Sequence, residues 1–353
     1  MRVMVAMSGG VDSSVAAALA VERGWTVTGV TLKLWGGQSD SGCCSVSDVE
    51  DARRVSASLG IAHHVFDFSD EFDRHVVQPY VDAYAVGRTP NPCIECNRHL
   101  KFDRLLQRAV RLGFDAVVTG HHARVAAGPG GAPLVHRGRD AAKDQSYVLS
   151  MLRGEQLRRV LLPIGDLTKA EVRAIAARRG LATAAKPDSL DTCFISAAAG
   201  GREAFLASRI AVRPGRLVDH ATGAVVGSVP SVQMVTVGQR RGLGAGSGRG
   251  RRYAVSVDID RGEVRVGGRD DLLTDRLVVE DWQWTAEPAE GTRLWFQSSA
   301  HGAPAPGTVA RTGERVQLHF DMPQRRPAPG QTVAAYSGDA VIGSGLVSGT
   351  RLF

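Results

Sequence analysis

A glycine-rich stretch near the start of the chain has the composition of a phosphate-binding loop. Residues Ser8–Ser13 read SGGVDS and lie between an apolar run, Arg2–Met7, and an amphipathic run, Ser13–Arg23. Two glycines let the backbone approach phosphate oxygens, and the following helix start offers N–H groups and a positive dipole end. Asp12 is placed to hold Mg²⁺ or to cap that helix. The G-K-[ST] of the Walker motif is absent, so the loop is of another kind. A plain glycine-rich turn is the alternative.

Three cysteines carry a second kind of chemistry. Cys93 and Cys96 form a C-x-x-C pair in NPCIECN, and Cys193 lies in PDSLDTCFI. The pair alone fits zinc, redox or cluster chemistry, and the lack of a second C-x-x-C argues against a four-cysteine zinc site. Cys96 is expected just before a helix N-terminus, where the dipole favours a thiolate. Converging thiols predict either a metal with an open position or a nucleophile with a resolving partner. Cys43 and Cys44 are interpreted as small buried residues.

Two polar stretches follow later in the chain. Gly120–Ala123 reads GHHA and ends a predicted strand, so Gly120 suits a backbone contact with a nucleotide and His121 could reach substrate. A histidine held only for packing is an equal alternative. Lys143–Ser146 reads KDQS and places a cation, an acid and an amide together; taken alone, such a group is more commonly a solvated helix cap.

Strands and helices alternate through residues 1–190, which predicts a parallel sheet with crossover helices on both faces. Such a sheet binds ligands at the carboxyl ends of its strands. Thr168 is the expected N-cap and Gly180 the expected C-cap of the last helix. The expected strands are Arg2–Met7, Trp25–Leu34, His64–Phe68 and Phe114–Thr119. The expected helices are Ser13–Arg23, Ser47–Leu59, Phe72–Val86, Arg98–Leu112 and Lys169–Arg179.

After residue 205 the chain becomes rich in Gly, Val and Arg, with short alternating runs such as Ala254–Ile259, Glu263–Val266 and Arg315–Phe320. This texture predicts a small β domain and then a barrel or sandwich. Residues 240–252 hold five Arg and five Gly without an acid. They form either a flexible surface loop or a loop that contacts nucleic-acid phosphates.

Composition limits the class of protein. The 353 residues predict two or three domains, and 43% hydrophobic with 22% charged residues excludes a disordered or fibrous chain. No apolar run is long enough for a membrane span, and MRVMVAM is no signal peptide, so we expect a cytoplasmic protein. The net charge of +7 favours a polyanionic partner, although a genome preference for arginine explains it equally well. Five cysteines do not form a disulfide scaffold.

Taken together, the motifs resemble those of the tRNA-specific 2-thiouridylases, in the same order and over essentially the whole chain. The motifs are SGGVDS, NPCIECN, GHHA, KDQS, PDSLDTCFI and TVGQRRGLG. Members of this family are sulfurtransferases that place sulfur on C2 of uridine 34 in the anticodon loop. The resemblance implies an α/β parallel-sheet N-type ATP pyrophosphatase (adenine nucleotide alpha hydrolase-like) domain over 1–204. A small central β-rich tRNA-binding domain over 205–271 and a C-terminal β-barrel over 272–353 would follow. It further implies ATP, Mg²⁺ and a sulfur donor such as a cysteine desulfurase or sulfur-relay protein.

The resemblance also implies residue roles. Asp12, Cys96 and Cys193 would be catalytic. Cys96 matches the family's nucleophile and Cys193 matches its persulfide carrier. Asn91, Pro92 and Cys93 match the stretch that meets the target base. His121, Lys143, Asp144, Gln145 and Gln331 match tRNA contacts. The ATP site matches Ala6, Met7, Ser8, Gly9, Gly10, Val11, Asp12, Ser13, Leu32 and Gly120.

This chain departs from the family at two places. Many members carry Asp where Cys93 stands, so a [4Fe–4S] cluster on Cys93, Cys96 and Cys193 is an alternative to the persulfide. The persulfide scheme ends in a Cys96–Cys193 disulfide, whereas an open iron would deliver sulfide without one. The sequence decides neither, and the third cysteine favours the cluster. A basic R-Y-R-Q-like barrel element is replaced by Ser299–Gly302, which removes the basis for an anticodon contact there.

Overall fold

The computed structural model describes residues 1–35, 45–188, 192–195, 200–243, 251–312 and 315–349. The predictions for Cys43, Cys44 and residues 244–250 therefore lie outside the described residues. The chain folds into two compact units, and each contains segments distant in sequence. Unit 1 consists of Met1–Val77, Pro92–Arg202 and Asp339–Ile342. Unit 2 consists of Gln78–Asn91, Glu203–Gly338 and Gly343–Phe353.

Unit 1 is built on a five-stranded parallel sheet, which confirms the predicted fold class. The strand order is β3-β2-β1-β4-β7, so the order reverses on either side of β1. Val3 and Val5 of β1 are fully buried, as expected for a strand covered on both faces. A ligand crevice is expected where β1 and β4 end. The strands are β1 (Arg2–Ala6), β2 (Thr26–Lys33), β3 (Ala62–Asp67), β4 (Ala116–Val118) and β7 (Val160–Leu161).

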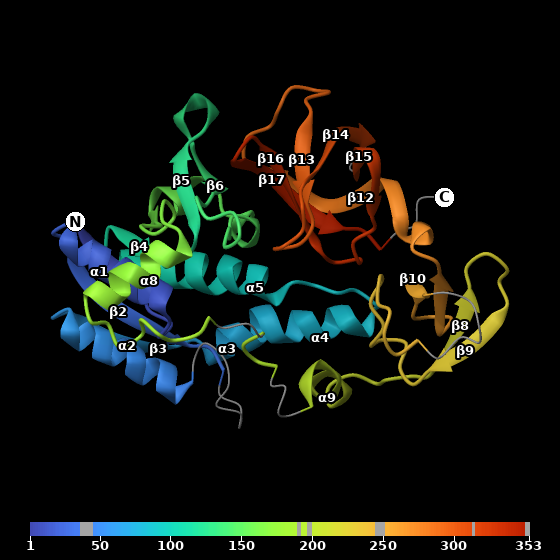
Figure 1. Cartoon of the computed structure of the whole chain (residues 1–353), viewed down its shortest axis with the longest axis horizontal. Coiled ribbons are helices and arrows are strands. Elements are labelled where there is room, and N and C mark those ends of the chain that lie inside the picture. Colours follow the sequence, from blue (N-terminus) through green and yellow to red (C-terminus); the bar gives the residue numbers. More distant parts are fainter. Residues whose placement is uncertain (36–44, 189–191, 196–199, 244–250, 313–314, 350–353) are drawn as a thin grey trace. The chain divides into compact units, whose positions relative to one another are not determined.

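Helices cover this sheet. Four alanines of α1 are fully buried, and their small side chains let α1 pack closely against both the sheet and α8 (Figure 1). The helical segments of unit 1 are α1 (Val11–Glu22), α2 (Val46–Ser58), α3 (Ser69–Phe72), η1 (Asp73–Val77), α5 (Pro92–Glu95), η2 (Cys96–Arg104), η3 (Pro129–Gly131), η4 (Tyr147–Leu149), α6 (Leu105–Arg111), α7 (Gly154–Arg158) and α8 (Lys169–Arg178). A hairpin, β5 (Ala123–Ala127) and β6 (Pro133–Arg137), follows β4.

Several predicted boundaries need correction. The single helix expected over 72–86 consists of α3, the π-helical η1 and α4 (Gln78–Ala85). Thr168 is the N-cap of α8, as predicted, and it forms a capping box with Glu171. The C-cap of α8 is Arg179, and Gly180 follows with φ +62°. Gly180 therefore supplies the left-handed turn one residue beyond the predicted position.

Unit 2 contains α4, most of α9 (Gly201–Ala207), a small sheet and a barrel. The small sheet has the order β10-β11-β8-β9 around a core that includes Val232, Val264 and Val266. In the barrel, β12-β15-β14-β13-β16-β17 closes through the β12–β17 pairing (Figure 1). The strands are β8 (Gly215–Asp219), β9 (Val225–Val229), β10 (Tyr253–Asp258), β11 (Glu263–Gly267), β12 (Leu273–Trp284), β13 (Leu294–Gln297), β14 (Ala305–Thr312), β15 (Arg315–Arg325), β16 (Thr332–Ser337) and β17 (Ala340–Val347), with a 3₁₀ turn η6 at Asp270–Leu272. No helix among the described residues is long and apolar enough to span a membrane.

Candidate active site

The SGGVDS loop joins β1 to α1 at the point where the strand order reverses. Gly9 has φ +72°, and a Cβ there would lie 2.3 Å from the carbonyl oxygen of Asp48. Only glycine fits this turn, because both the backbone conformation and the space exclude a side chain. Gly10 is the N-cap of α1, and no side chain caps this helix. The first N–H groups of α1 therefore face the crevice, as anion-binding helix starts do.

The predicted ATP-site residues surround this turn. Ala6 ends β1, Met7 and Val11 are buried, and Ser8 is exposed. Ser13 accepts a hydrogen bond from the Ser8 N–H at 3.2 Å and donates one to the Gly10 carbonyl at 3.0 Å. Leu32 lies near the end of β2. The two hydrogen bonds of the Ser13 hydroxyl hold the loop in one conformation.

Gly120 meets the same turn from β4. A Cβ on Gly120 would lie 2.5 Å from both the Asp12 carbonyl carbon and the Ser13 nitrogen. Glycine at 120 is therefore required for the end of β4 to approach the start of α1. This packing role is independent of any contact with a nucleotide.

Asp12 does not cap α1, contrary to one of the two predicted roles. Its two carboxylate oxygens accept hydrogen bonds from Lys169 Nζ at 2.8 and 2.7 Å, and Oδ1 lies 3.2 Å from His122 Nε2. Burial raises the pKa of Asp12, but the hydrogen bonds with His122 and Lys169 outweigh it, and the pKa is lowered. Asp12 is thus an anion held by two groups from later in the chain.

Lys169 links Asp12 to the cysteine-bearing stretch PDSLDTCFI. Its ammonium also lies 2.8 Å from Asp188, and its side chain is only 11% exposed. Lys143 and Arg173 pair with Asp188 as well, at 2.8 and 2.9 Å. Burial raises the pKa of Asp188, but hydrogen bonds from Lys143 and Lys169 outweigh it and lower the pKa to about 2. We call Asp12, His122, Lys143, Lys169, Arg173 and Asp188 the phosphate-edge network.

Sequence reasoning missed four members of this network, namely His122, Lys169, Arg173 and Asp188. In the sequence, Lys169 is only the residue that follows an N-cap. No neighbouring residue indicates that its ammonium reaches Asp12. The one available signal for His122 was the doubled histidine of GHHA, from which the neighbouring His121 was chosen. His121 is instead buried, with Nδ1 2.8 Å from Thr119 Oγ1. Burial lowers the pKa of His121 well below its usual value, so this ring is neutral.

The predicted tRNA contacts of the KDQS stretch make bonds within unit 1. Asp144 pairs with Arg137 at 2.9 Å, and only 7% of its side chain is exposed. The Gln145 side chain accepts a hydrogen bond from the His122 N–H at 2.8 Å. Gln145 thus fixes the backbone at His122, whereas Asp144 holds Arg137 and the Gly138 N–H. Their contact with tRNA stays a prediction.

Cys96 lies within a continuous helical stretch, so its predicted place before a helix start is wrong. The helix begins at Pro92, because proline lacks the N–H that the first helical position leaves unused. Of the two cysteines, Cys93 is therefore nearer the helix start, and it is exposed, whereas Cys96 is buried. Because this crossover stretch leads into β4 antiparallel to it, Cys96 lies toward the carboxyl edge of the sheet. Phe102, further along, packs on His121 at 5.7 Å between ring centroids.

Cys193 lies at the same edge of the sheet. The ring of the next residue, Phe194, packs against Trp35, which follows β2, and Phe72, which follows β3. The centroid distances are 6.2 and 5.7 Å. Cys193 is half-buried. Within the described part of the chain, no three His, Cys, Asp or Glu side chains are grouped so that they could hold a metal ion.

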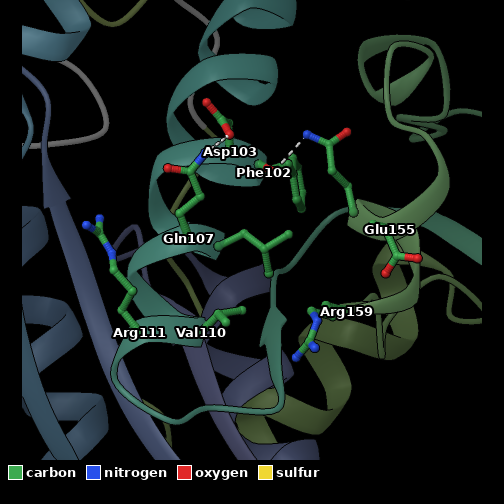
Figure 2. Close-up of a pocket in the computed structure, with 9 residues that line it drawn as sticks. Phe102, Asp103, Gln107, Val110, Arg111, Glu155 and Arg159 are labelled. Carbon is green, nitrogen blue, oxygen red and sulfur yellow. Dashed lines mark hydrogen bonds between the residues drawn. The ribbon is translucent and has the colours of Figure 1, made fainter.

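A depression of about 440 Å³ lies elsewhere in unit 1 (Figure 2). Val110 and Arg111 end the helix that leads into β4, and Arg159 directly precedes β7. The depression thus runs along the helical stretch that precedes β4, and its lining includes no residue of the SGGVDS turn or of the phosphate-edge network. The phosphate-edge network, and not this depression, has the position expected of a nucleotide site.

The strand order, the uncapped helix start after β1 and the following barrel domains define an N-type ATP pyrophosphatase with a central domain and a C-terminal β-barrel. Residues 1–197 match the family model "tRNA methyl transferase HUP domain". Residues 203–268 match "tRNA methyl transferase PRC-barrel domain", and residues 274–347 match "Aminomethyltransferase beta-barrel domain". The predicted limits 1–204, 205–271 and 272–353 stay a prediction.

Curated relatives match nearly the full chain. A tRNA-specific 2-thiouridylase MnmA of Thermobifida fusca is 47% identical over 99% of this chain and 96% of its own length. Its counterpart from Mycolicibacterium smegmatis is 47% identical over 99% of both chains. The chain belongs to the tRNA-specific 2-thiouridylase family, an enzyme family, as its motifs indicated.

Solved structures resemble about half of the chain. An NMN synthetase from Francisella tularensis is 21% identical with a TM-score of 0.35, over 53% of this chain and 66% of that one. A 4-thiouridine synthetase, solved with RNA and bound ATP, is 20% identical with a TM-score of 0.36, over 53% of this chain and 42% of that one.

Proposed function

We propose that this protein is a tRNA-uridine 2-sulfurtransferase that uses ATP to convert the C2 oxygen of uridine 34 to sulfur. The observation that carries the proposal is the uncapped start of α1 beside the Lys169 ammonium, at the carboxyl edge of the sheet. Cys193 belongs to the same edge through Phe194. Family membership supports tRNA as the substrate.

The first step activates the base. The C2 oxygen of uracil is a poor leaving group, so AMP is transferred to it from ATP and pyrophosphate departs. The N–H groups of Gly9 and Gly10 and the Lys169 ammonium stabilise the charge that develops on the pyrophosphate. The phosphate-edge network supplies three permanent cations against two carboxylates, which favours a polyanionic ligand.

Mg²⁺ receives no ligand from Asp12 in this arrangement. Both oxygens of Asp12 already accept hydrogen bonds from Lys169, and the described residues provide no metal-binding group of three. The chain's own contribution at this position is therefore the Lys169 ammonium. Mg²⁺ that accompanies ATP would be held by the phosphates.

The second step transfers sulfur. A donor such as a cysteine desulfurase or a sulfur-relay protein converts Cys193 to a persulfide. The terminal sulfur attacks C2, AMP leaves, and the base stays linked to Cys193 through a disulfide bond. The Cys96 thiolate then attacks the Cys193 sulfur, which forms a Cys96–Cys193 disulfide and releases 2-thiouridine. An external thiol reduces that disulfide before the next turnover.

The [4Fe–4S] alternative requires Cys93, Cys96 and Cys193 to converge on one cluster. No such group exists among the described residues, so we derive no step through a cluster. Substitution of Cys93 distinguishes the two schemes. Cys93→Ala should retain substantial persulfide-dependent activity, whereas it would abolish activity that depends on a three-cysteine cluster.

The proposal is tested by incubating the protein with unmodified tRNA, ATP, Mg²⁺ and a persulfide donor, followed by mass analysis of the nucleosides. We expect 2-thiouridine at position 34 from the wild type and none from Cys193→Ala. A parallel reaction with anaerobically purified, iron-reconstituted protein includes the cluster scheme. Unmodified tRNA in both reactions would refute the proposed function.

A further inference from the structure

A loop of unit 2 that ends at Asn91, the first residue matched to the target base, is held by a turn of the barrel domain. The turn comprises residues 328–331 and precedes β16. The Thr89 N–H donates to the Pro329 carbonyl at 2.7 Å. The Gln331 side-chain amide donates to the Thr89 carbonyl. Both backbone polar groups of Thr89 are thus bound by residues about 240 positions later in the chain.

Close packing accompanies these bonds. Gly330 has φ +85°, and a Cβ there would lie 3.1 Å from Arg88 Cβ and 3.3 Å from the Thr89 nitrogen. A side chain at 330 would therefore push the loop away as well as strain the turn. The loop and the turn fit each other at backbone level.

The turn is itself fixed to the barrel. The Gly330 N–H donates to the Val347 carbonyl at 2.9 Å, and the Val347 N–H donates to the Gln331 carbonyl at 2.8 Å. Gln331 is followed by Thr332, which is buried and begins β16. The Gln331 amide is consequently presented from a rigid position.

The loop has two further contacts within unit 2. The Thr89 hydroxyl lies 3.4 Å from the Thr236 hydroxyl, the first residue of the TVGQRRGLG motif. Arg88 pairs with Glu280 of β12. Arg325 donates to the Gly238 carbonyl at 2.7 Å and so ties that motif to the barrel. Three sequence-distant elements therefore meet at residues 88 and 89.

We infer that Gln331 is a positioning residue: it fixes the backbone at Thr89, so that Asn91 presents the target uridine in one geometry. This inference rests on the proposed function and deepens it. It is a different role from the direct tRNA contact that the family resemblance implies for Gln331, since it uses the amide N–H that binds the Thr89 carbonyl. Small displacements near reacting atoms lower the rate of chemistry far more than they lower binding.

The test uses Gln331→Met, which keeps the size and the neutral charge but removes the donor. With the full-length protein, we expect the single-turnover rate of 2-thiouridine formation at saturating tRNA to fall about tenfold. The Kd for tRNA should stay within about twofold of the wild type. A raised Kd with an unchanged rate at saturation would show direct tRNA contact and overturn the inference. No change in either quantity would overturn it as well.

A matched control and a second variant exclude general damage. Gln324 donates to the Met322 carbonyl within its own strand at 2.9 Å, so Gln324→Met removes the same kind of bond without touching the loop. It should leave the rate unchanged. Thr236→Val removes the weaker contact, and we expect a smaller fall in the same direction.

Hydrogen exchange separates a failure of this inference from a failure of the proposed function. Gln331→Met should accelerate amide exchange in the peptide that contains residues 86–92, whatever reaction the protein catalyses. Gln324→Met should not. Unchanged protection of that peptide in Gln331→Met would overturn the positioning role even if 2-thiouridine is formed.

Discussion

The phosphate-edge network of unit 1 and the contacts of Thr89 with residues 329–331 of unit 2, which we call the Thr89 anchor, bring distant segments together by different means. The network uses ion pairs among partly buried side chains, with Lys169 between Asp12 and Asp188. The anchor relies mainly on uncharged hydrogen bonds to backbone groups and on a glycine that permits close approach. Charges near a phosphate site can exchange partners when an anion binds, whereas backbone bonds maintain one geometry. We therefore expect substitutions in the network to affect nucleotide chemistry and substitutions at the anchor to affect base positioning.

Asp12→Ala should cause the largest loss. It leaves the Lys169 ammonium with one carboxylate and removes the partner of His122, so pyrophosphate release should fall by about 10² to 10³. Affinity for tRNA should change little. The matched control is Glu22→Gln, which breaks the Glu22–Arg179 pair at the other end of the same two helices. An unchanged rate of pyrophosphate release in Asp12→Ala would mean that the loop is misassigned.

Gly9→Ala tests whether the loop tolerates any side chain. The added Cβ meets the Asp48 backbone at 2.3 Å, so the free energy of unfolding should fall by about 3 kcal/mol. Gly24 has nearly the same φ, +73°, with nothing within 4 Å of its Cβ position. Gly24→Ala should therefore cost only about 1 kcal/mol. If urea unfolding shows the same loss of free energy for Gly9→Ala and Gly24→Ala, close contact with the Asp48 backbone is not what excludes a side chain at residue 9.

Asp188→Asn measures the contribution of charge to the network. The pKa of Asp188 is lowered from its ordinary value of 3.8 to about 2 in the folded protein, so its ionised form stabilises the fold. This contribution is complete above about pH 5 and is lost as the pH falls toward 2. In urea unfolding, the free energy of unfolding of the wild type should exceed that of the variant by about 1 kcal/mol at pH 7 and by progressively less below pH 4. Because Gln331→Met removes no charge, its free energy of unfolding should differ from that of the wild type by the same amount at every pH.

The smallest effect is expected from the exposed arginines Arg240 and Arg241. If the 240–252 stretch contacts tRNA phosphates, replacing both by Gln should reduce the slope of log affinity against log salt by about 1.5. Arg261 and Arg293, which pair with acids elsewhere in unit 2, serve as the control pair. A slope identical to that of the control would place the phosphate contacts elsewhere.

The sequence predicted those parts of the site that depend on local chemistry. The parallel sheet, the glycine turn after its first strand and the N-cap at Thr168 follow from periodicity and backbone requirements. The start of the cysteine helix was predicted at Arg98, just after Cys96, although Pro92 carried the signal for an earlier start. The partners of Asp12 were not predictable, because Lys169 and His122 reach it only after the crossover connections have formed. The same holds for Gln331, whose bond to Thr89 joins two family-model regions.

The most direct test of the central claim is a crystal structure of the protein with a non-hydrolysable ATP analogue. We predict that the phosphates lie against the N–H groups of Gly9 and Gly10, with the Lys169 ammonium within hydrogen-bonding distance of a phosphate oxygen. Phosphates bound instead in the depression whose lining includes Val110, Arg111 and Arg159 would contradict the account.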